Sequence, residues 1–501
     1  MSKTVDFGGR PFHFIGIGGI GMSALAYILT KRKFPVSGSD LRLTHITQRL
    51  QEAGAHIFWQ QEASNLSYFQ TLSNQSQYPW SAVGANAAPS APAAQWLPQV
   101  ICSTAIDTSN LEYQAALQLG CPIFHRSDLL AALIQDYSSI AVAGTHGKTT
   151  TSSMVGLLLL RAGLDPTIVV GGEVSAWEGN ARLGYGPHLV AEADESDGSL
   201  TKLSASIGVI TNIELDHTDH YQSLDDVIAT FKTFAEKCSL LVGCIDCATV
   251  RDAIQPSITY SLHPESGADY VADDITYHAG GTQATICEKG QPLGTLTLQV
   301  LGQHNLSNAL AAIAVGRALG LPFAQIAEGL SHFEGARRRF ELKGHHGGIR
   351  FVDDYAHHPS EIRATLAAAR LKLKDVSYSG AVKRIVAVFQ PHRYSRTAAF
   401  LPDFANAFAD ADRVIVTDIY SAGEVNSFGV CGRQVASEIA ARHAHTEYQD
   451  TLVSVQQALT ETLEPGDLVL FLGAGNLNQV IPNVMAYYAD SEAQPLQQAC
   501  R

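Results

Sequence analysis

Short apolar runs recur along the chain, and each is followed by a glycine-rich or polar turn and then by a segment with helical spacing. Such runs are typical of buried strands in a parallel sheet. The strands predicted in this way are Phe12–Ile15, Val36–Asp40, Val100–Ala105, Ser139–Ala143, His188–Glu192, Ile207–Asn212, Ile349–Asp354, Ile385–Phe389, Arg413–Asp418 and Asp467–Gly475. The predicted helices include Met22–Lys33, Thr151–Ala162, Leu306–Leu319 and Pro359–Arg370. Alternation of strands and helices predicts an α/β protein with mostly parallel sheets.

Three blocks of this pattern each begin with a strand of their own, which predicts three domains. We expect a Rossmann-like N-terminal domain over residues 1–137 and a central P-loop ATPase-like domain over residues 138–335. A Rossmann-like C-terminal domain is expected over residues 336–501. Within the first block, Ser73–Pro98 is rich in Ser, Ala and Pro without periodicity, and we interpret it as an exposed loop.

The composition narrows the function classes. The 501 residues carry a net charge of −14, which disfavours a general binder of nucleic-acid backbones. No apolar run reaches the length of about 20 residues that spans a bilayer, and the first residues do not resemble a secretory signal. Eight scattered cysteines, including the pair Cys244 and Cys247, form neither a disulfide framework nor a zinc pattern. We therefore expect a cytoplasmic protein without a membrane or nucleic-acid partner.

The second block opens with the strongest chemical motif. The strand Ser139–Ala143 is followed by Gly144, Thr145, His146, Gly147, Lys148, Thr149 and Thr150, and then by a helix. Glycines allow backbone N–H groups to approach phosphates, and the start of a helix attracts anions. Lys148 is suited to the β- and γ-phosphates of a nucleotide, and the Thr149 hydroxyl is suited to Mg²⁺. The loop is shorter than the standard GxxxxGK[ST] form, but its context predicts binding of ATP.

Acidic residues follow the next two predicted strands of this block. Glu192, Asp194, Glu195 and Asp197 come after one strand, and Glu214, Asp216 and His217 come after the other. Carboxyl ends of parallel strands are where α/β active sites form, and phosphoryl transfer requires neutralisation of charge. These clusters therefore predict metal ligands beside the phosphate loop.

The N-terminal block carries a second glycine loop. Gly16, Gly18 and Gly21 satisfy the GxGxxG pattern, and Asp40 follows at the end of the next strand. The pattern predicts a site for a pyrophosphate, which belongs either to a nucleoside-diphosphate sugar or to NAD. Because an ATP loop lies in the neighbouring block, a nucleotide sugar is favoured.

The third block contains polar, cation-rich turns, RRRF, DDYAHHP and FQPHRYSRT. Together with GIGGIGMSALA, GTHGKTTT, EADESD, TNIELDH and GQHNLSNALAA, they resemble the motifs of the Mur ligase family, in that family's order and over nearly the full chain. The resemblance implies that the first domain binds a uridine diphosphate sugar, the second ATP and the third an amino acid.

The branch of the family that the motifs resemble most joins L-alanine to the lactyl carboxylate of UDP-N-acetylmuramate in peptidoglycan precursor synthesis. The resemblance therefore implies an ATP-dependent ligase that forms an acyl phosphate, with ATP and Mg²⁺ as cofactors. A monomer or a homodimer is expected.

The resemblance also assigns roles to individual residues. Lys148, His357, Arg393 and Arg396 are implied as catalytic, with the last three binding L-alanine or orienting the acyl phosphate. Thr149, Glu192 and His217 are implied as metal ligands. The implied ATP-binding residues are Gly144, Thr145, His146, Gly147, Lys148, Thr149, Thr150, Asn305, Asn308, Arg338, Arg339 and Asp354. The implied substrate-binding residues are Gly18, Gly19, Ile20, Gly21, Ser39, Asp40, Ser103, Thr104 and His358.

One residue of the family pattern, a metal-bridging lysine, has two possible counterparts in this chain. Several Mur ligases carry a carbamylated lysine that bridges the metals, and Lys232 lies 15 residues after His217. The local match instead puts Phe231 at that place, so we assign Lys232 no role.

Three alternatives stay open from the sequence. A recycling ligase that attaches a murein tripeptide to UDP-N-acetylmuramate shares almost all of the ATP motifs, although the loop GIGGIGM favours the alanine-adding branch. An NAD-dependent oxidoreductase would explain GxGxxG but not Lys148, Glu192 or His217. A non-catalytic nucleotide-binding regulator would keep its function after loss of Lys148.

Overall fold

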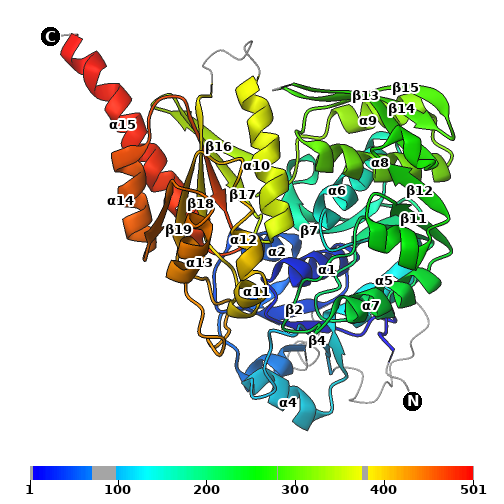
Figure 1. Cartoon of the computed structure of the whole chain (residues 1–501). Coiled ribbons are helices and arrows are strands. Elements are labelled where there is room, and N and C mark those ends of the chain that lie inside the picture. Colours follow the sequence, from blue (N-terminus) through cyan, green and yellow to red (C-terminus); the bar gives the residue numbers. More distant parts are fainter. Residues whose placement is uncertain (1–3, 70–96, 279, 375–381, 500–501) are drawn as a thin grey trace, which may run out of the picture. The chain divides into compact units, whose positions relative to one another are not determined.

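A computed structural model describes residues 4–69, 97–278, 280–374 and 382–499 of the chain (Figure 1). The described chain forms two compact units. The first unit comprises Met1–Gly144, Val155–Ile210 and Ala229–Leu241. The second comprises Thr145–Met154, Thr211–Ile228 and Val242–Arg501. All but the last two residues of the predicted loop Ser73–Pro98 lie outside the described residues.

A five-stranded sheet with the order β3-β2-β1-β4-β5 begins the first unit, and all of its pairs are parallel. Its strands are β1 (Phe12–Ile15), β2 (Val36–Ser39), β3 (His56–Phe58), β4 (Gln99–Cys102) and β5 (Ile123–His125). The accompanying helices are α1 (Ile20–Lys31), α2 (His45–Ala53), α4 (Leu111–Leu119) and α5 (Arg126–Gln135). α1 directly follows β1 and the glycine loop, so its first turn faces the carboxyl end of the sheet, where nucleotides bind in such folds.

A second set of strands in this unit pairs in the order β10-β6-β9-β7-β8. They are β6 (Ser138–Ala143), β7 (Thr167–Val174), β8 (Gly179–Arg182), β9 (His188–Glu192) and β10 (Ile207–Ile210). β6 lies between β9 and β10 with parallel pairing, and the central residues of all three strands are buried and mostly apolar. The carboxyl ends of β6 and β9 therefore lie at the same edge of the sheet.

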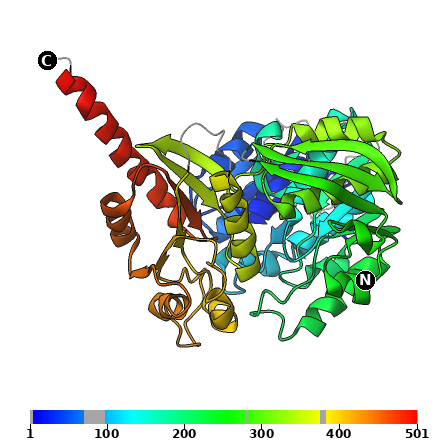
Figure 2. The same ribbon diagram turned by 45° about the horizontal axis from the view of Figure 1, so that its top comes forward.

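The second unit contains a meander that the sequence did not predict. β12 (Ile258–Ser261) pairs in parallel with β13 (Tyr270–His278), and β13, β14 (Gly281–Glu288) and β15 (Gln291–Leu298) are antiparallel, as Figure 2 shows for the long strands. β11 (Leu240–Cys244) pairs with β12. α8 (Gln303–Ala318), which is almost entirely buried, and α9 (Phe323–Ser331) pack beside these strands.

The C-terminal part of the second unit is a six-stranded sheet with the order β16-β17-β21-β18-β19-β20, in which only the β16–β17 pair is antiparallel. Its strands are β16 (Glu341–His346), β17 (Ile349–Asp354), β18 (Arg384–Phe389), β19 (Arg413–Thr417), β20 (Thr446–Gln449) and β21 (Asp467–Leu472). Apolar side chains cover both faces, with α10 (Pro359–Lys374) and α13 (Gly432–Ala440) on one face. α14 (Leu452–Thr462) and α15 (Ile481–Ala499) cover the other (Figure 1).

The remaining helices border the candidate site or connect sheets. They are α6 (Lys148–Arg161), α7 (Leu224–Glu236), α11 (Tyr394–Ala399) and α12 (Leu401–Phe404). Within the second unit, α10 also packs against β13 and α8, so its start lies among residues of the central block. Among the described residues, no helix combines the length and the apolar character needed to cross a membrane.

Candidate active site

The phosphate loop is held by neighbouring strands and by α8. Gly147 has φ of +80°, and a Cβ atom there would lie only 2.6 Å from Asn308 Oδ1. Asn308 is fixed in turn, because its Oδ1 accepts a 3.1 Å hydrogen bond from Thr151. Both the conformation and the close approach require glycine at 147, so the loop can bring its backbone near a ligand. Asn308, which the family resemblance implies as an ATP-binding residue, therefore supports the Gly147 turn.

The segment after β10 fixes the other side of this loop. The His146 N–H donates to Asn212 Oδ1 at 2.8 Å, and the His146 carbonyl accepts from Thr211 Oγ1 at 2.6 Å. Thr145 Oγ1 accepts from the Glu214 N–H at 2.9 Å. Sequence reasoning treated this segment as a source of metal ligands only and missed Asn212. Lys148 Nζ folds back to donate to the Thr145 carbonyl at 3.2 Å.

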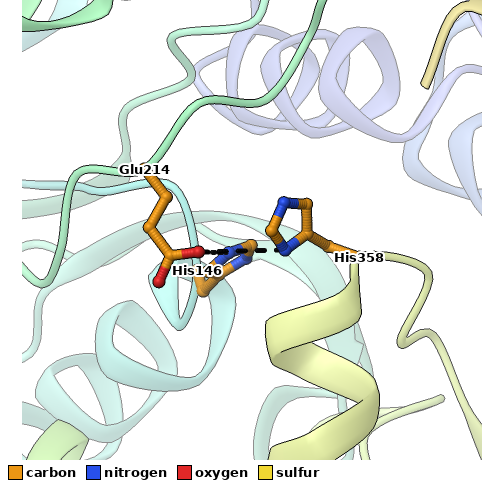
Figure 3. A group of neighbouring side chains, drawn as sticks. All are labelled: His146, Glu214 and His358. Atoms are coloured by element: carbon orange, nitrogen blue, oxygen red, sulfur yellow. Dashed lines mark ion pairs between the residues drawn. The ribbon is translucent and has the colours of Figure 1, made fainter. Parts of the chain in front are cut away.

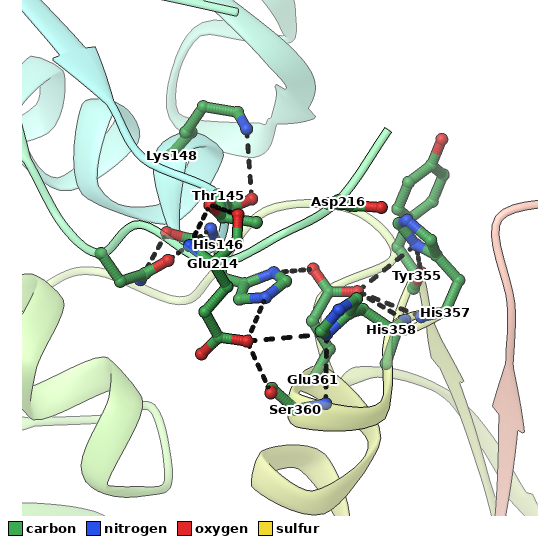
Figure 4. A network of polar contacts seen from close by, with 12 residues as sticks. Thr145, His146, Lys148, Glu214, Asp216, Tyr355, His357, His358, Ser360 and Glu361 are labelled. Carbon is green, nitrogen blue, oxygen red and sulfur yellow. Dashed lines mark hydrogen bonds and ion pairs between the residues drawn. The ribbon is translucent and has the colours of Figure 1, made fainter. Parts of the chain in front are cut away.

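The His146 ring lies between two carboxylates, those of Glu214 (Figures 3 and 4) and Glu361 (Figure 4). Nδ1 is 3.2 Å from Glu361 Oε1, and Nε2 is 3.4 Å from Glu214 Oε2. Burial alone would lower the pKa of His146, but hydrogen bonds and charges from Glu214 and Glu361 outweigh it and raise the pKa to about 10. Burial would raise the pKa of Glu214, and the hydrogen bond from His146 instead lowers it to about 2. The ring is therefore an imidazolium at neutral pH.

His146, Glu214 and His358 have the donor atoms of a transition-metal site. Two of the facing atoms already accept hydrogen bonds, however. Ser360 Oγ donates to Glu214 Oε2 at 2.8 Å, and the Ser360 N–H donates to His358 Nδ1 at 3.3 Å (Figure 4). The bound proton of His146 supplies the positive charge that the carboxylates require. In this structure the three side chains therefore form a hydrogen-bonded charge network.

The three sequence-predicted magnesium ligands have chemistry that fits the ion. Thr149 is buried in the first turn of α6. Glu192 is the last residue of β9, and its carboxylate accepts the Gly171 N–H at 2.6 Å. His217 has φ of +51°, a strained conformation for a non-glycine residue, which is typical of functional sites. The hydroxyl of Thr149 in the second unit and the carboxylate of Glu192 in the first are oxygen donors of the kind that Mg²⁺ prefers, and the assignment of the three residues as its ligands stays a prediction.

The turn after β17 holds His357 as a neutral base. His357 Nδ1 lies 2.9 Å from the Tyr355 carbonyl, which can only accept, so Nδ1 carries the proton and Nε2 a lone pair. Burial lowers the pKa of His357 to about 4, and the nearby Arg396 contributes. The pKa of His392, whose ring centre is 5.7 Å away, is lowered to about 2, also mainly by burial. Both rings therefore serve as hydrogen-bond acceptors.

The two arginines that follow β18 are paired with carboxylates of the protein. Arg396 Nε lies 2.7 Å from Asp216 Oδ1, and both side chains are buried. Arg393 Nη1 lies 2.8 Å from Asp219 Oδ2 and 3.1 Å from Glu424 Oε1. Burial would raise the pKa of Asp216, but Arg396 keeps it well below its usual range. The structure thus brings both arginines to the segment that contains His217.

Asp354 and the arginines after α9 complete this region. The carboxylate of Asp354 accepts N–H groups of Phe340 at 2.7 Å and Ala356 at 2.8 Å. Burial raises its pKa to about 6 although Arg339 opposes the shift. Arg338 Nη2 donates to the Gly473 carbonyl at 2.6 Å. Arg339 instead lies 3.9 Å from Glu361, on the side of His146.

Two neighbouring residues in the first turn of α8, His304 and Asn305, belong to the GQHNLSN motif. Asn305 is buried and donates to the Leu301 carbonyl at 2.7 Å. Burial, assisted by Arg339, lowers the pKa of the neighbouring His304 to about 4. Sequence reasoning did not single out His304, whose position in the GQHNLSN motif was its only signal.

The N-terminal glycine loop has the form of an anion site. Gly19 precedes α1, and the Gly18 N–H donates to Asp40 Oδ2 at 2.8 Å. A Cβ atom at Gly18 would lie 2.7 Å from the same oxygen, so a larger residue there would have to displace the Asp40 carboxylate. Ile20 is exposed, whereas the Ser39 hydroxyl is buried and donates to Glu112. Ser103 and Thr104 lie in the turn after β4.

Arg126 is a residue that sequence reasoning missed. Its Nη1 would lie 3.5 Å from a Cβ atom at Gly21, beside the glycine loop. Its Nη2 lies 2.8 Å from Asp194 Oδ2, in the acidic segment after β9. Nothing in the local sequence HRSD distinguished this arginine from a surface charge, because both neighbours are distant along the chain.

Family models match most of the chain. They are described as "Mur ligase middle domain" over residues 142–316, "Mur ligase, glutamate ligase domain" over residues 338–475, and "Mur ligase family, catalytic domain" over residues 11–138. The three α/β domains predicted from the sequence are thereby confirmed. The domain boundaries predicted between residues 137 and 138 and between residues 335 and 336 stay predictions.

Relatives and solved structures agree with these matches. A UDP-N-acetylmuramate–L-alanine ligase from Nostoc punctiforme is 63% identical over 98% of this chain and 99% of its own length, and one from Microcystis aeruginosa is 61% identical over 98% of each. The crystal structure of the UDP-N-acetylmuramate–alanine ligase of Thermotoga maritima matches with a TM-score of 0.77 at 27% identity, covering 96% of this chain and 100% of that one. A murein peptide ligase from Psychrobacter arcticus shares the fold at 21% identity, with a TM-score of 0.66, over 96% of this chain and 99% of that one.

Proposed function

The chain belongs to the Mur ligase family, and we propose that it joins L-alanine to the lactyl carboxylate of UDP-N-acetylmuramate with cleavage of ATP to ADP and phosphate. The observation that carries this proposal is the identity of about 60% to alanine-adding ligases over almost the whole chain. The phosphate loop and the neutral His357 beside paired arginines supply chemistry that this reaction needs.

A carboxylate is a poor electrophile, so the lactyl carboxylate first attacks the γ-phosphorus of ATP. An O–P bond forms, the bond to the β-phosphate oxygen breaks, and ADP leaves. The amine of L-alanine then attacks the acyl carbon, and the tetrahedral intermediate expels inorganic phosphate. Catalysis of the first step rests on positioning and charge stabilisation, because phosphoryl transfer leaves the protein little covalent work.

The residues to which the family resemblance assigns the nucleotide and the metal divide these tasks. Lys148 and the N–H groups at the start of α6 bind the phosphates, and Asn308 keeps the Gly147 turn in place. Asn305, Arg339 and Asp354 contact the nucleotide from α8 and from the C-terminal domain. Thr149, Glu192 and His217 would hold Mg²⁺, which when bound neutralises charge on the transferred phosphoryl group.

His357 and the arginines act on the amino acid. With its proton fixed on Nδ1, His357 presents Nε2 as an acceptor for an N–H of the attacking amine. Arg393 and Arg396 bind the amino-acid carboxylate and orient the acyl phosphate. Gly18–Gly21 and Asp40 bind the uridine diphosphate group in the N-terminal domain, with Ser103 and Thr104 beside it, and Arg126 adds a cation there.

The deciding experiment is phosphate release from ATP and Mg²⁺ in the presence of UDP-N-acetylmuramate. L-Alanine is compared with the tripeptide L-alanyl-γ-D-glutamyl-meso-diaminopimelate, and reactions without the sugar nucleotide serve as the blank. We expect strong stimulation by L-alanine alone. Stimulation by the tripeptide alone would make the protein a recycling ligase, and silence with both amines would remove the proposed substrates.

A further inference from the structure

Glu361 lies at the centre of the charge network although no motif assigned it a role (Figure 4). It is the third residue of α10, and its side chain is 13% exposed. Oε2 accepts the N–H groups of His357 at 3.1 Å and His358 at 3.3 Å. Together with the Ser360 N–H, which donates to His358 Nδ1, this is a capping-box arrangement that satisfies the start of the helix.

The second oxygen of Glu361 has a different set of partners. Oε1 lies 3.2 Å from His146 Nδ1 in the phosphate loop and 3.9 Å from Arg339 Nη1. Capping of α10 needs Oε2 alone, so the contacts of Oε1 are not explained by the helix. Burial opposes ionisation, but His357, His146 and Arg339 hold the pKa of Glu361 well below its usual range. The group is a carboxylate with both oxygens engaged.

A carboxylate is a rigid plane, and its two oxygens cannot move independently. A shift of the turn 355–358 that carries Oε2 also displaces Oε1 from His146. A shift of the phosphate loop likewise pulls on the turn that presents His357. We propose that Glu361 is a positioning residue that couples the ATP site to the amino-acid site, so that binding of either ligand favours binding of the other. The proposal rests on the proposed function, because it takes the turn at His357 as the amino-acid site.

The competing explanation is that Glu361 only caps α10. Glutamine also serves at the third helical position of a capping box, so Glu361→Gln preserves the cap. The amide oxygen can still accept the two N–H groups. The NH₂ group would then meet the protonated Nδ1 of His146, donor against donor, and the link to the loop is lost. The variant therefore separates the two roles.

The chain offers a matched control at the start of α5. There the His125 N–H donates to Asp128 Oδ2 at 2.9 Å, and the His125 ring accepts from the Ser127 N–H at 3.3 Å. Asp128 occupies the same third position after a capping histidine, but its other ion pair is with Lys202 at 2.6 Å. Asp128→Asn thus removes the charge of an equivalent cap without touching the phosphate loop.

The experiment measures the dissociation constant of Mg²⁺ and β,γ-methylene-ATP by calorimetry, with saturating UDP-N-acetylmuramate and with or without L-alanine. In the unaltered protein we expect L-alanine to tighten nucleotide binding by about tenfold, a typical size for coupled sites. In Glu361→Gln the factor should fall to about one, and in Asp128→Asn it should be unchanged. Retained coupling in Glu361→Gln, or no coupling in the unaltered protein, would overturn the proposal.

A second variant keeps the test decisive if Glu361→Gln folds poorly. His146→Gln cuts the same link from the loop side, and the double variant should lose no more coupling than either single one. Additive losses would show that the two residues act separately and would also refute the link. Failure of the proposed function is distinguishable, because it appears in the unaltered protein as absence of L-alanine-dependent phosphate release.

Discussion

Two glutamates, Glu112 in the first compact unit and Glu361 in the second, have similar neighbours but different roles. Glu112 in α4 is fully buried and accepts hydrogen bonds from Ser39 and from Asn65 Nδ2 at 2.6 Å. His13 Nε2 is 3.2 Å away, and its Nδ1 is 2.8 Å from Ser37. Glu361 is also near a histidine and accepts several hydrogen bonds, but its neighbours include an imidazolium, a guanidinium and backbone N–H groups.

The two networks differ in whether every polar atom has a hydrogen-bond partner. We call the network around Glu112 closed and the one around Glu361 open. Around Glu112, both ring nitrogens of His13 and the hydroxyls of Ser37 and Ser39 have partners within the first unit, so the network is closed. Around Glu361, the buried His358 Nε2 has no hydrogen-bond partner among the described residues. Closed polar networks stabilise a fold, whereas unsatisfied buried groups are the ones a ligand can complete. The comparison therefore predicts opposite consequences for substitutions in the two networks.

The largest effect on activity is expected for Lys148→Ala, because Lys148 lies in the same phosphate loop as His146 of the open network. Loss of the cation that binds the phosphates should reduce L-alanine-dependent phosphate release by at least about a thousandfold. The midpoint of thermal unfolding should change little, because the side chain is half-buried and lies outside the apolar core. Preserved turnover would contradict the role in phosphate binding that we give to Lys148.

Glu112→Ala should have the converse profile. Removing the acceptor at the centre of a closed network leaves buried donors unpaired, so the free energy of unfolding should fall by about 3–5 kcal/mol. Urea unfolding measures the change, with the exposed Glu438→Ala in α13 as the control, expected within about 0.5 kcal/mol. If Glu112→Ala were as stable as that control, the proposed distinction between the networks would be wrong.

His146→Gln tests the charge of the open network through pH. The pKa of His146 is raised from 6.5 to about 10, so its contribution to stability is fully present below pH 6.5 and is lost as pH rises to 10. The unaltered protein should be more stable than the variant by about 2 kcal/mol at pH 6.5, and the difference should shrink toward pH 10. A difference that stays constant over this range would mean that the ring is neutral in the folded protein.

Gly147→Ala should weaken ATP binding by about tenfold, through left-handed strain and the clash with Asn308. Gly163 after α6 provides a matched control, because its φ is +75° and no atom lies within 4 Å of an added Cβ. Gly163→Ala should cost about 1 kcal/mol of stability and leave the KM for ATP unchanged. Equal KM values for the two variants would show that the close contact between Gly147 and Asn308 does not matter for ATP binding.

The smallest effect on activity is expected for Lys232→Ala. This variant tests whether Lys232 belongs to the active site. Lys232 is exposed in α7, next to the buried Phe231. Turnover should stay within about twofold of the unaltered protein, as for ordinary surface positions. A large loss of activity that bicarbonate modulates would instead identify a carbamylated lysine that bridges metals.

The fold was largely predictable wherever local pattern decides structure. The predicted strands Phe12–Ile15, His188–Glu192 and Ile349–Asp354 match β1, β9 and β17 residue for residue. α6 begins at Lys148 rather than Thr151, because its first turn is polar and has no apolar periodicity. The antiparallel meander β13–β15 was missed, since its alternating, partly exposed strands lack the continuous apolar runs of the parallel sheets.

The site was predictable as a set of motifs but not as a set of contacts. Motif spacing identified Lys148, His217 and His357. It could not reveal that Glu361 meets His146, which lies 215 residues earlier, because such a partnership exists only after folding. The stretch HHPSE carried one usable signal, since a glutamate at the third helical position predicts a capping box.

The pairing of Arg393 and Arg396 with carboxylates of the protein has a consequence for substrate exchange. An amino acid that binds them trades one ion pair for another, so the gain in Coulomb energy is largely cancelled by the pair that is given up. Net charge at the site changes little when a zwitterion enters or leaves. Such a site favours rapid turnover over retention, and its occupancy should follow the cellular amino-acid concentration and depend only weakly on ionic strength.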